Sequence, residues 1–409
     1  MAIVLPYGSE SSLALELLPE ALVAAFNAPH GVALADPVSA VQAAVRGPLE
    51  FPPLRQATVP GDRIVLALDE GVPRAADVVA AVTSYLVEEG TEADHITILQ
   101  APAESAEQSD PRDQLPEEWR GEVALEVHTP DVSGKLALLG SSRDGRPVYL
   151  NRTLLDADLV VPLGRLLCEG SLGYHGQYGG LYPTFSDEKT RQRFRKPRTD
   201  EGGRNGTARQ RAEIDEIGWL LGTQFTVQVL PGPRDKWLDV LAGEIRHVFE
   251  LGARRCAAAW TYAVPRRASL VVASLSGGPG QQTWGNLGRA LAVASEAVAP
   301  GGAIALCTEL AEEPGPAVAS LANIDDFEAA LRRIRREAES DALPAGEIAR
   351  TLENAKIYLL SRLDETTVED LGMASVADAR EMQRLARRHE SCIVLASAQY
   401  AAVALQEGP

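Results

Sequence analysis

Short apolar runs alternate with amphipathic segments along much of the chain. Three runs of strand length in the first half are residues 63–68, 95–99 and 158–162. Between the first two, apolar residues from Val78 to Leu86 repeat at helical spacing. Strands that alternate with helices are typical of a parallel sheet with helical crossovers. The pattern therefore predicts an α/β domain.

The same alternation returns in the second half of the chain. The predicted strands are residues 270–274, 303–307, 356–360 and 392–396, and the predicted helices are residues 286–299, 325–339 and 374–389. Residues 262–269, which include Pro265, separate the two halves. A chain of 409 residues is also longer than one ordinary core requires. We therefore expect an α/β protein of two domains with largely parallel sheets and a cleft between them: residues 1–262, residues 263–397, and a tail of residues 398–409.

The carboxyl ends of the predicted strands locate a candidate binding edge. Ligands of open parallel sheets bind beyond these ends, in the crevice that the loops form. The loops that follow Leu68, Leu99 and Val161 should therefore share one rim. Asp69 directly follows the first of these strands, where it is either a ligand-binding carboxylate or the cap of the next helix.

Residues 173–187 form the most unusual segment of the sequence. The segment contains four glycines, four aromatic residues and His175, in a chain that is only 5% aromatic. Glycines and a proline at this density disfavour a helix or strand and predict a shaped loop that approaches a ligand closely. We expect His175 to act as an acid or base there, with a purely structural loop histidine as the alternative. The tyrosines, including Tyr178 and Tyr182, either line a pocket or pack the loop.

Net charge limits the partners of the protein. The formal charge is −18, which disfavours nucleic acids and anionic membranes as partners. A local exception is residues 189–211, where nine Lys or Arg residues gather. This segment is either an anion-binding or interdomain lid, or a solvated face. No apolar run is long enough to span a membrane, and the start of the chain does not resemble a signal peptide, so we expect a cytoplasmic protein. The sequence leaves a homo-oligomer open.

Several common catalytic and metal-binding motifs are absent from the sequence. The four cysteines show no CxxC spacing, so reduced, buried thiols are expected rather than a zinc site. The glycine-rich residues 277–280 lack the spacing of a dinucleotide fingerprint and the lysine of a phosphate-binding loop. With only six histidines and no HExxH pair, no metal ligands are assigned.

The order of the segments resembles the nickel-pincer lactate racemase family from end to end. The similar pieces are residues 5–8, Asp69 with Pro73, residues 157–160, residues 178–180, residues 225–230, residues 241–252, residues 272–279 and residues 289–302. The resemblance implies two α/β domains with cofactor and substrate between them. It also implies a racemase or epimerase of a 2-hydroxy acid or sugar acid, so the expected partner is a small anionic carboxylate.

The resemblance implies a hydride mechanism with a nickel-bearing pyridinium nucleotide. In the family, a lysine holds this pincer cofactor covalently and a histidine caps the nickel. The cofactor takes a hydride from the α-carbon while a histidine removes the hydroxyl proton, and the hydride returns to either face. Such a reaction also needs a cation for the substrate carboxylate.

In the first domain, the family's functional positions match this chain only in part. Asp69 and the two glycines Gly179 and Gly180 match, whereas Val72 stands where an arginine is expected, and Arg74 is a candidate substitute. Tyr182 occupies the position of the covalent lysine, and no histidine follows where the nickel-capping one should be. A covalent pincer is therefore doubtful. A non-covalent pincer remains open, with its phosphate bound by Lys189 or by the arginine-rich segment.

In the second domain, Arg289 stands at the position of a substrate-binding lysine, and Asn286 stands where a glutamine is expected. We predict His175 and Arg289 as catalytic residues. Arg289, Asn286 and Tyr178 are the predicted substrate-binding residues. The predicted cofactor-binding residues are Asp69, Arg74, Gly179, Gly180, Tyr182 and Lys189. Three interpretations follow: a racemase or epimerase, an enzyme without nickel on the same scaffold, or a non-catalytic ligand-binding relative.

Overall fold

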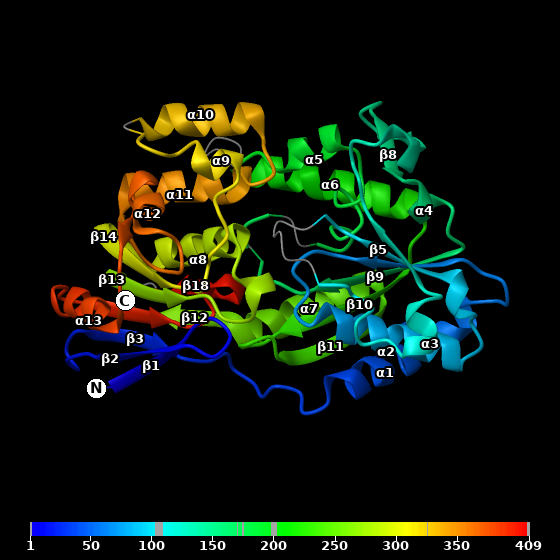
Figure 1. Ribbon diagram of the computed structural model, residues 1–409, viewed down its shortest axis with the longest axis horizontal. Helices are drawn as coiled ribbons and strands as arrows, with labels where there is room; N and C mark the ends of the chain where they lie inside the picture. The colour runs from blue at the N-terminus through cyan, green and yellow to red at the C-terminus, as the bar shows by residue number, and fades with distance from the viewer. Residues whose placement is uncertain are drawn as a thin grey trace.

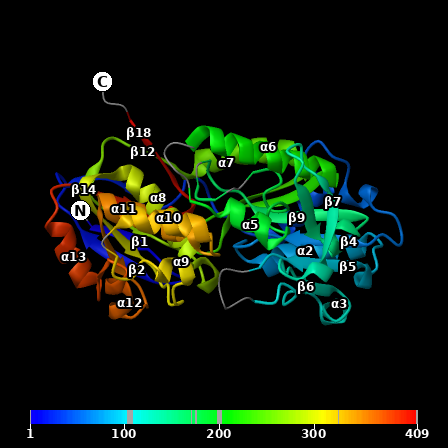
Figure 2. The same ribbon diagram turned by 90° about the horizontal axis from the view of Figure 1, so that it is seen from above.

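The computed structural model describes residues 2–102, 109–169, 171–173, 176–197, 203–324 and 326–406. Among these residues, two six-stranded sheets lie side by side and each is covered by helices (Figures 1 and 2). We call the units built on them the N-domain and the C-domain. The fold is α/β with largely parallel sheets, as the sequence predicts.

The N-domain sheet has the strand order β11-β10-β9-β4-β5-β6. Its strands are β4 (Ile64–Leu68), β5 (Ile96–Gln100), β6 (Ala124–Val127), β9 (Leu159–Arg165), β10 (Phe225–Pro231) and β11 (Trp237–Glu244). All neighbours pair in parallel except β10 and β11. Every residue of β4 is buried, because helices cover both faces of the sheet.

The N-domain helices lie on both sides of this sheet. They are α1 (Pro37–Arg46), α2 (Ala75–Glu88), α3 (Glu117–Arg120), α4 (Arg152–Leu155), α5 (Glu188–Phe194), α6 (Gly203–Leu221) and α7 (Ile245–Trp260). One apolar cluster joins α1 and α2 to one face, and another joins α4 and α6 to the opposite face. A hairpin of β7 (Leu136–Ser141) and β8 (Pro147–Asn151) extends from this domain.

The C-domain sheet is wholly parallel, with the order β16-β15-β14-β13-β17-β3. Its strands are β3 (Leu22–Phe26), β13 (Ala268–Ser274), β14 (Val298–Cys307), β15 (Lys356–Leu360), β16 (Ala374–Ser375) and β17 (Cys392–Leu395). Its helices are α8 (Trp284–Ala297), α9 (Pro316–Ala319), α10 (Phe327–Glu337), α11 (Ala342–Asn354), α12 (Glu365–Asp370) and α13 (Ala379–Arg387). The predicted helix 374–389 thus begins late, because residues 374–375 form β16 and Asp378 caps α13 through the backbone N–H groups of Arg380 and Glu381.

Both ends of the chain belong to the C-domain, which corrects the predicted boundaries. The hairpin of β1 (Ala2–Pro6) and β2 (Ser12–Glu16) packs on the C-domain sheet, and β3 is its edge strand (Figure 1). The predicted tail contains β18 (Ala402–Leu405), which pairs with β12 (Thr261–Val264). No periodic pattern near residue 22 indicates that β3 pairs with a strand 370 residues away.

Two further features bear on the predicted class of protein. Within the described part of the chain, no helix has the length and apolarity needed to cross a membrane. All four cysteines are buried and free.

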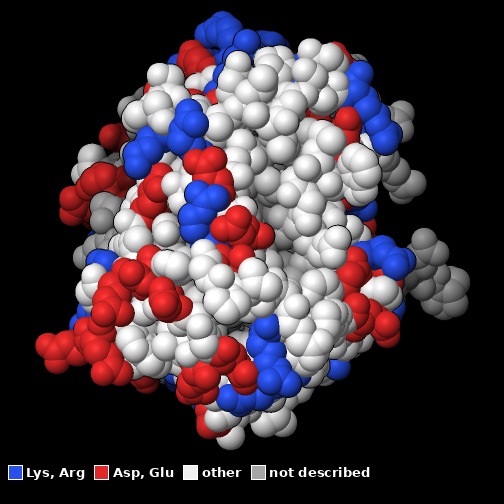
Figure 3. Space-filling model, turned by 90° about the vertical axis from the view of Figure 1, so that its right-hand side faces the viewer, with Lys and Arg blue, Asp and Glu red and all other residues white. Residues whose placement is uncertain are grey.

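Figure 3 shows the end of the molecule formed by the N-domain, where Lys and Arg side chains are interspersed with Asp and Glu around an uncharged area.

Candidate functional site

The carboxyl ends of the strands in the two domains face each other across a cavity of about 360 Å³, which we call the first cavity. Its N-domain wall comes from the ends of β4, β5 and β9, from the residues that follow β4 and β5, and from the turn between β10 and β11. Its C-domain wall comes from the loop between β13 and α8 together with the first turns of α8. The main lining residues are Asp69, Glu70, Gly71, Arg74, Gln100, Arg165, Asp235, Gly278, Gln281, Asn286 and Arg289. The cavity therefore lies at the rim that the sequence predicts.

A second cavity, of about 450 Å³, adjoins the first. Glu70, Ala101 and Arg289 line both cavities. The other walls come from the glycine-rich loop, from α5, and from the C-domain loops before α9 and α11. The polar and glycine residues among them include Gly173, Gly179, Thr184, Glu188, Arg191, Arg195, Glu312 and Asp341.

Asp69 is the central carboxylate of the first cavity. It follows β4, and its Oδ1 accepts a hydrogen bond of 2.9 Å from the backbone N–H of Glu70. The surrounding protein raises the pKa of Asp69 to about 6, mainly because burial disfavours the charged form and also because Glu70 is negative. Arg165 and Arg289 act in the opposite direction and favour the carboxylate. A carboxyl with this pKa exchanges protons near neutral pH, as a general acid or base must.

Arg165 is the last residue of β9 and is 6% exposed. Among the described residues, its Nη1 has no hydrogen-bond partner. The guanidinium lies against Gly71, which has a φ of 64°, and a Cβ on Gly71 would come within 2.6 Å of Arg165 Cζ. Only glycine allows this approach at that backbone conformation. The structure therefore holds a buried cation with an unused donor at the wall of the first cavity.

Arg289 enters the cavity from the C-domain, on the second turn of α8. Its Nη1 donates to Asn286 Oδ1 at 2.9 Å, and Asn286 Nδ2 donates to the backbone oxygen of Gln281 at 2.8 Å. Gln281 Oε1 in turn accepts from the hydroxyl of Tyr400 at 2.8 Å, and its Nε2 donates across the domain boundary to the backbone oxygen of Gly71. This chain of buried hydrogen bonds fixes the direction of the Arg289 guanidinium.

Several predicted site residues therefore meet at the first cavity. Asp69, Arg289 and Asn286 line it, as the sequence analysis expects. Arg74 also lines it, but its guanidinium is ion-paired with Asp77 and lies over the ring of Trp237. Gly179 lines the second cavity, and Gly180 lies against Asp69, where a Cβ would be 3.4 Å from Oδ2.

Two predicted tyrosines lie away from both cavities. Tyr178 packs against Gly218 of α6, where no room for a Cβ remains. Tyr182 is 2% exposed, and its hydroxyl donates to Glu213 Oε1 at 2.7 Å. Arg193 completes this group with two hydrogen bonds of 2.6 Å to Glu213 and one of 3.0 Å to the Tyr182 hydroxyl. Both rings pack between the glycine-rich loop and α6 and line neither cavity, so the roles of Tyr178 at the substrate and of Tyr182 at the cofactor stay predictions without support from the two cavities.

Two predicted site residues remain: Lys189 and His175. Lys189 is exposed on α5 and lines neither cavity, so its role at the cofactor stays a prediction that the two cavities do not support. Arg191 and Arg195, on the same helix, line the second cavity instead. His175 lies outside the described residues, and its catalytic role stays a prediction.

The residues of the two cavities do not fit a covalently held nickel pincer. Tyr182 stands in place of the lysine and is engaged with Glu213 and Arg193. Among the described residues that line the cavities there is no lysine, histidine or cysteine, so the nitrogen and sulfur ligands that nickel favours are missing there. We therefore derive no reaction step through this cofactor.

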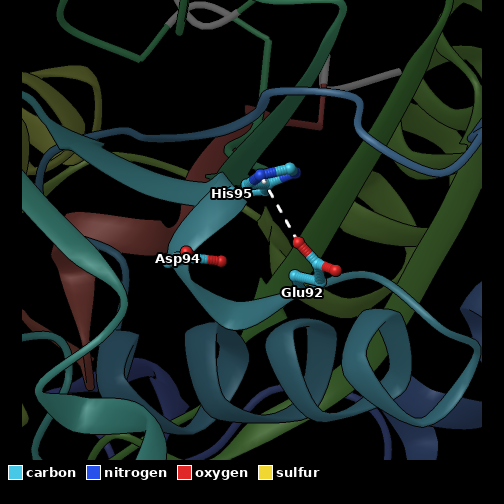
Figure 4. A group of neighbouring side chains, drawn as sticks. All are labelled: Glu92, Asp94 and His95. Atoms are coloured by element: carbon cyan, nitrogen blue, oxygen red, sulfur yellow. Dashed lines mark ion pairs between the residues drawn. The ribbon is translucent and has the colours of Figure 1, made fainter.

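Among the described residues, one group could offer three ligand atoms to a metal ion: Glu92, Asp94 and His95 (Figure 4). His95 Nε2 lies 3.5 Å from Glu92 Oε2. The group precedes β5, whereas the cavity residue Gln100 ends this strand, so the two are a strand length apart. Both acids are exposed, and the group has no part in the cavities.

The sequence analysis missed Arg165, Gln281 and Arg191. A signal for Arg165 was present, because the predicted rim includes the end of the strand that begins near residue 158. Gln281 follows the glycine-rich residues 277–280, which we had compared only with nucleotide-binding motifs. Arg191 belongs to the basic segment, but helical spacing alone does not show which of its cations face a cavity.

Comparisons with known proteins agree with this architecture. Residues 7–196 match the family of the lactate racemase N-terminal domain. The structure is similar to the lactate racemase apoprotein from Thermoanaerobacterium thermosaccharolyticum, with a TM-score of 0.78 and 18% identity over 99% of this chain and 100% of that chain. It is also similar to a protein from Thermotoga maritima, with a TM-score of 0.63 and 12% identity over 90% of this chain and 97% of that one. No curated protein sequence matches the chain.

The family match covers the loops that carry Asp69, Arg165 and Tyr182, and the structural matches extend the same fold to the C-domain. Residues 7–196 therefore match the lactate racemase N-terminal domain family, and the chain as a whole has the fold of the lactate racemase apoprotein.

Proposed function

We propose that the first cavity binds the carboxylate of a small 2-hydroxy acid and that the protein is an isomerase of the racemase or epimerase type. The observation that carries this proposal is the meeting of Arg165 and Arg289 beside Asp69. The two arginines come from different domains, and both act on the charge of Asp69. A guanidinium binds a carboxylate through two parallel hydrogen bonds, which fixes the orientation of the substrate.

In this proposal, the substrate carboxylate takes the donor that Arg165 leaves unused. Arg289 binds the same carboxylate from the opposite wall. The positive end of the α8 dipole also attracts this negative charge. Because Asn286 and Gln281 hold Arg289 in place, little side-chain entropy is lost when the ligand binds.

Asp69 is the proposed proton acceptor. In its ionised form it accepts the proton of the 2-hydroxyl group or of the α-carbon, and a pKa near 6 leaves it largely ionised at neutral pH. Inversion at the α-carbon requires a second group on the opposite face of the substrate. We propose His175 for this role, since the glycine-rich loop that contains it borders the second cavity through Gly173 and Gly179.

The residues around Tyr182 favour the version of this function without nickel. A hydride route needs an acceptor for the hydride, and the family's anchor for that acceptor is replaced here by a hydroxyl engaged with Glu213 and Arg193. A route by proton transfer uses only the acid and base groups of the chain. The two routes differ in the fate of the hydrogen on the α-carbon.

The test is isomerisation in D₂O. Single enantiomers of a panel of 2-hydroxy acids are incubated with the protein and analysed by chiral chromatography and mass spectrometry, with Asp69→Asn as the inactive control. We expect inversion with one deuterium at the α-carbon. Inversion with the original hydrogen retained would show hydride transfer and refute the route without nickel. If no 2-hydroxy acid binds or inverts, the proposed function is wrong.

A further inference from the structure

The second cavity contains a pair of arginines that the proposed carboxylate site does not use. Arg191 lies on α5, Arg195 caps the C-terminal end of this helix four residues later, and both line the cavity. Arg195 donates to Glu188 Oε1 at 2.7 Å. Within the described part of the chain, the Arg191 guanidinium has no hydrogen bond and no ion pair, although it is only partly exposed to solvent.

The surroundings of Arg191 are unfavourable for a lone cation. Burial lowers the pKa of Arg191, and the positive charge of Arg195 lowers it further. Glu70, Glu188 and Asp131 oppose this effect, but none of them lies within ion-pair distance. A cation that has lost much of its hydration without gaining a partner is a binding position for an anion.

Glu70, Asp131 and Glu312 line the second cavity, but among the described residues no acid forms an ion pair with Arg191. Glu188 is paired with Arg195. Asp341 accepts hydrogen bonds of 2.9 Å from the backbone N–H groups of Ala317 and Val318, where it caps α9. Glu313 and Glu339 are exposed to solvent on the C-domain side. An anionic ligand could therefore pair with Arg191 without displacing an ion pair of the described residues.

The first and second cavities adjoin each other at Glu70, Ala101 and Arg289, which line both. Each cavity is in the size range that holds drug-sized ligands. A three-carbon acid bound at Arg165 and Arg289 would leave the second cavity empty. A longer acid would extend past Arg289 toward Arg191.

We infer that the substrate is a dianion: a 2-hydroxy acid whose far end carries a second anionic group, a carboxylate or a phosphate, bound by Arg191 and Arg195. The carboxylate end rests on the proposed function, whereas the far end rests on the second cavity alone. Guanidinium groups bind carboxylate and phosphate through the same planar fork, so the two arginines accept either group.

The test measures binding by isothermal titration calorimetry with three ligands of matched carbon number: a 2-hydroxy monocarboxylate, a 2-hydroxy dicarboxylate, and a 2-hydroxy acid with a terminal phosphate. They are titrated into the full chain and into Arg191→Gln, Arg195→Gln and Arg289→Gln. The control is Lys189→Gln, which removes the same charge from the exposed side of the same helix. Thermal unfolding of each variant shows that it is folded.

We expect at least one dianion to bind at least tenfold more tightly than the monocarboxylate, since a charge-assisted hydrogen bond is worth at least that factor. Arg191→Gln should remove this advantage and leave the affinity for the monocarboxylate unchanged, Arg191→Lys should restore part of it, and Lys189→Gln should have no effect. Which dianion binds more tightly identifies the second group.

Each other outcome refutes a defined part of the reasoning. If the monocarboxylate binds through Arg289 and neither dianion binds more tightly, the inference is wrong and the proposed function stands. If a dianion binds through Arg191 but Arg289→Gln has no effect, the second cavity binds anions and the proposed carboxylate site is wrong. If no ligand binds, both are wrong.

Discussion

Asp69→Asn should make the protein more stable at neutral pH than the unsubstituted chain. The replacement keeps the shape of the side chain and the oxygen that accepts from Glu70, but it cannot ionise. Asp69 has a pKa of about 6 in the folded protein, against an ordinary value of 3.8. The folded state therefore binds the proton more tightly than the unfolded state does, and stability falls as the pH rises between these two values.

The size of the effect follows from the two pKa values. Each unit between them corresponds to about 1.4 kcal/mol, so the ionised carboxylate costs up to roughly 3 kcal/mol above pH 6. This is an upper value, because Asp69 keeps some contact with solvent through the cavity. Between about pH 4.5 and pH 7.5, the free energy of unfolding of Asp69→Asn should gain roughly 2 kcal/mol relative to the unsubstituted chain.

Urea unfolding at several pH values, followed by fluorescence, measures this difference directly. Asp113→Asn, at an exposed position, is the control for the loss of one negative charge. The reasoning is refuted if the stability difference between Asp69→Asn and the unsubstituted chain is the same at both ends of the pH range. If the stability advantage of Asp69→Asn instead falls as the pH rises, the attraction of Arg165 and Arg289 for the carboxylate outweighs the cost of its burial.

Three further predictions concern the walls of the first cavity and the Tyr182 group. Arg289→Gln should weaken binding of 2-hydroxy acids at least tenfold in calorimetry, because a charge-assisted fork is lost; an unchanged affinity would contradict the carboxylate site. Gly71→Ala should weaken the same binding by displacing Arg165, whereas Gly90→Ala, which has a positive φ but open space around it, should only lower the melting temperature. Equal effects of the two alanines on binding would refute the close contact. Tyr182→Phe should cost about 1–3 kcal/mol in urea unfolding and leave ligand affinity unchanged, because it removes the two hydrogen bonds of the Tyr182 hydroxyl, to Glu213 and from Arg193, away from both cavities.

Local sequence patterns were sufficient to predict the secondary structure where buried strands alternate with amphipathic helices. The apolar run at residues 63–68 corresponds to β4, and the helical spacing that follows corresponds to α2. The edge strands β3 and β6 were not predicted, because they have only five and four residues and the partner of β3 is far away in the sequence. The start of α13 was placed too early because the cap at Asp378 was not recognised.

Sequence patterns could locate only those site residues whose position relative to a strand or helix end places them at the rim of the sheet. Asp69 and Arg289 were found because one follows a strand and the other begins a helix at the rim. Tyr182 and Lys189 were assigned by correspondence with a family, and correspondence gives no information about which way a side chain points. The direction of Tyr182 depends on Glu213 and Arg193, which lie 31 and 11 residues further along the chain.

The position of β3 has a consequence for how the protein is made. The ribosome releases β3 long before its partner β17, so the C-domain sheet cannot be completed until the residues between them have been made. The N-domain strands lie between them in the sequence and can pair earlier. Contacts at such long sequence separation form slowly. During that interval β3 presents an unpaired strand, and we expect this segment of the nascent chain to need protection from non-native pairing.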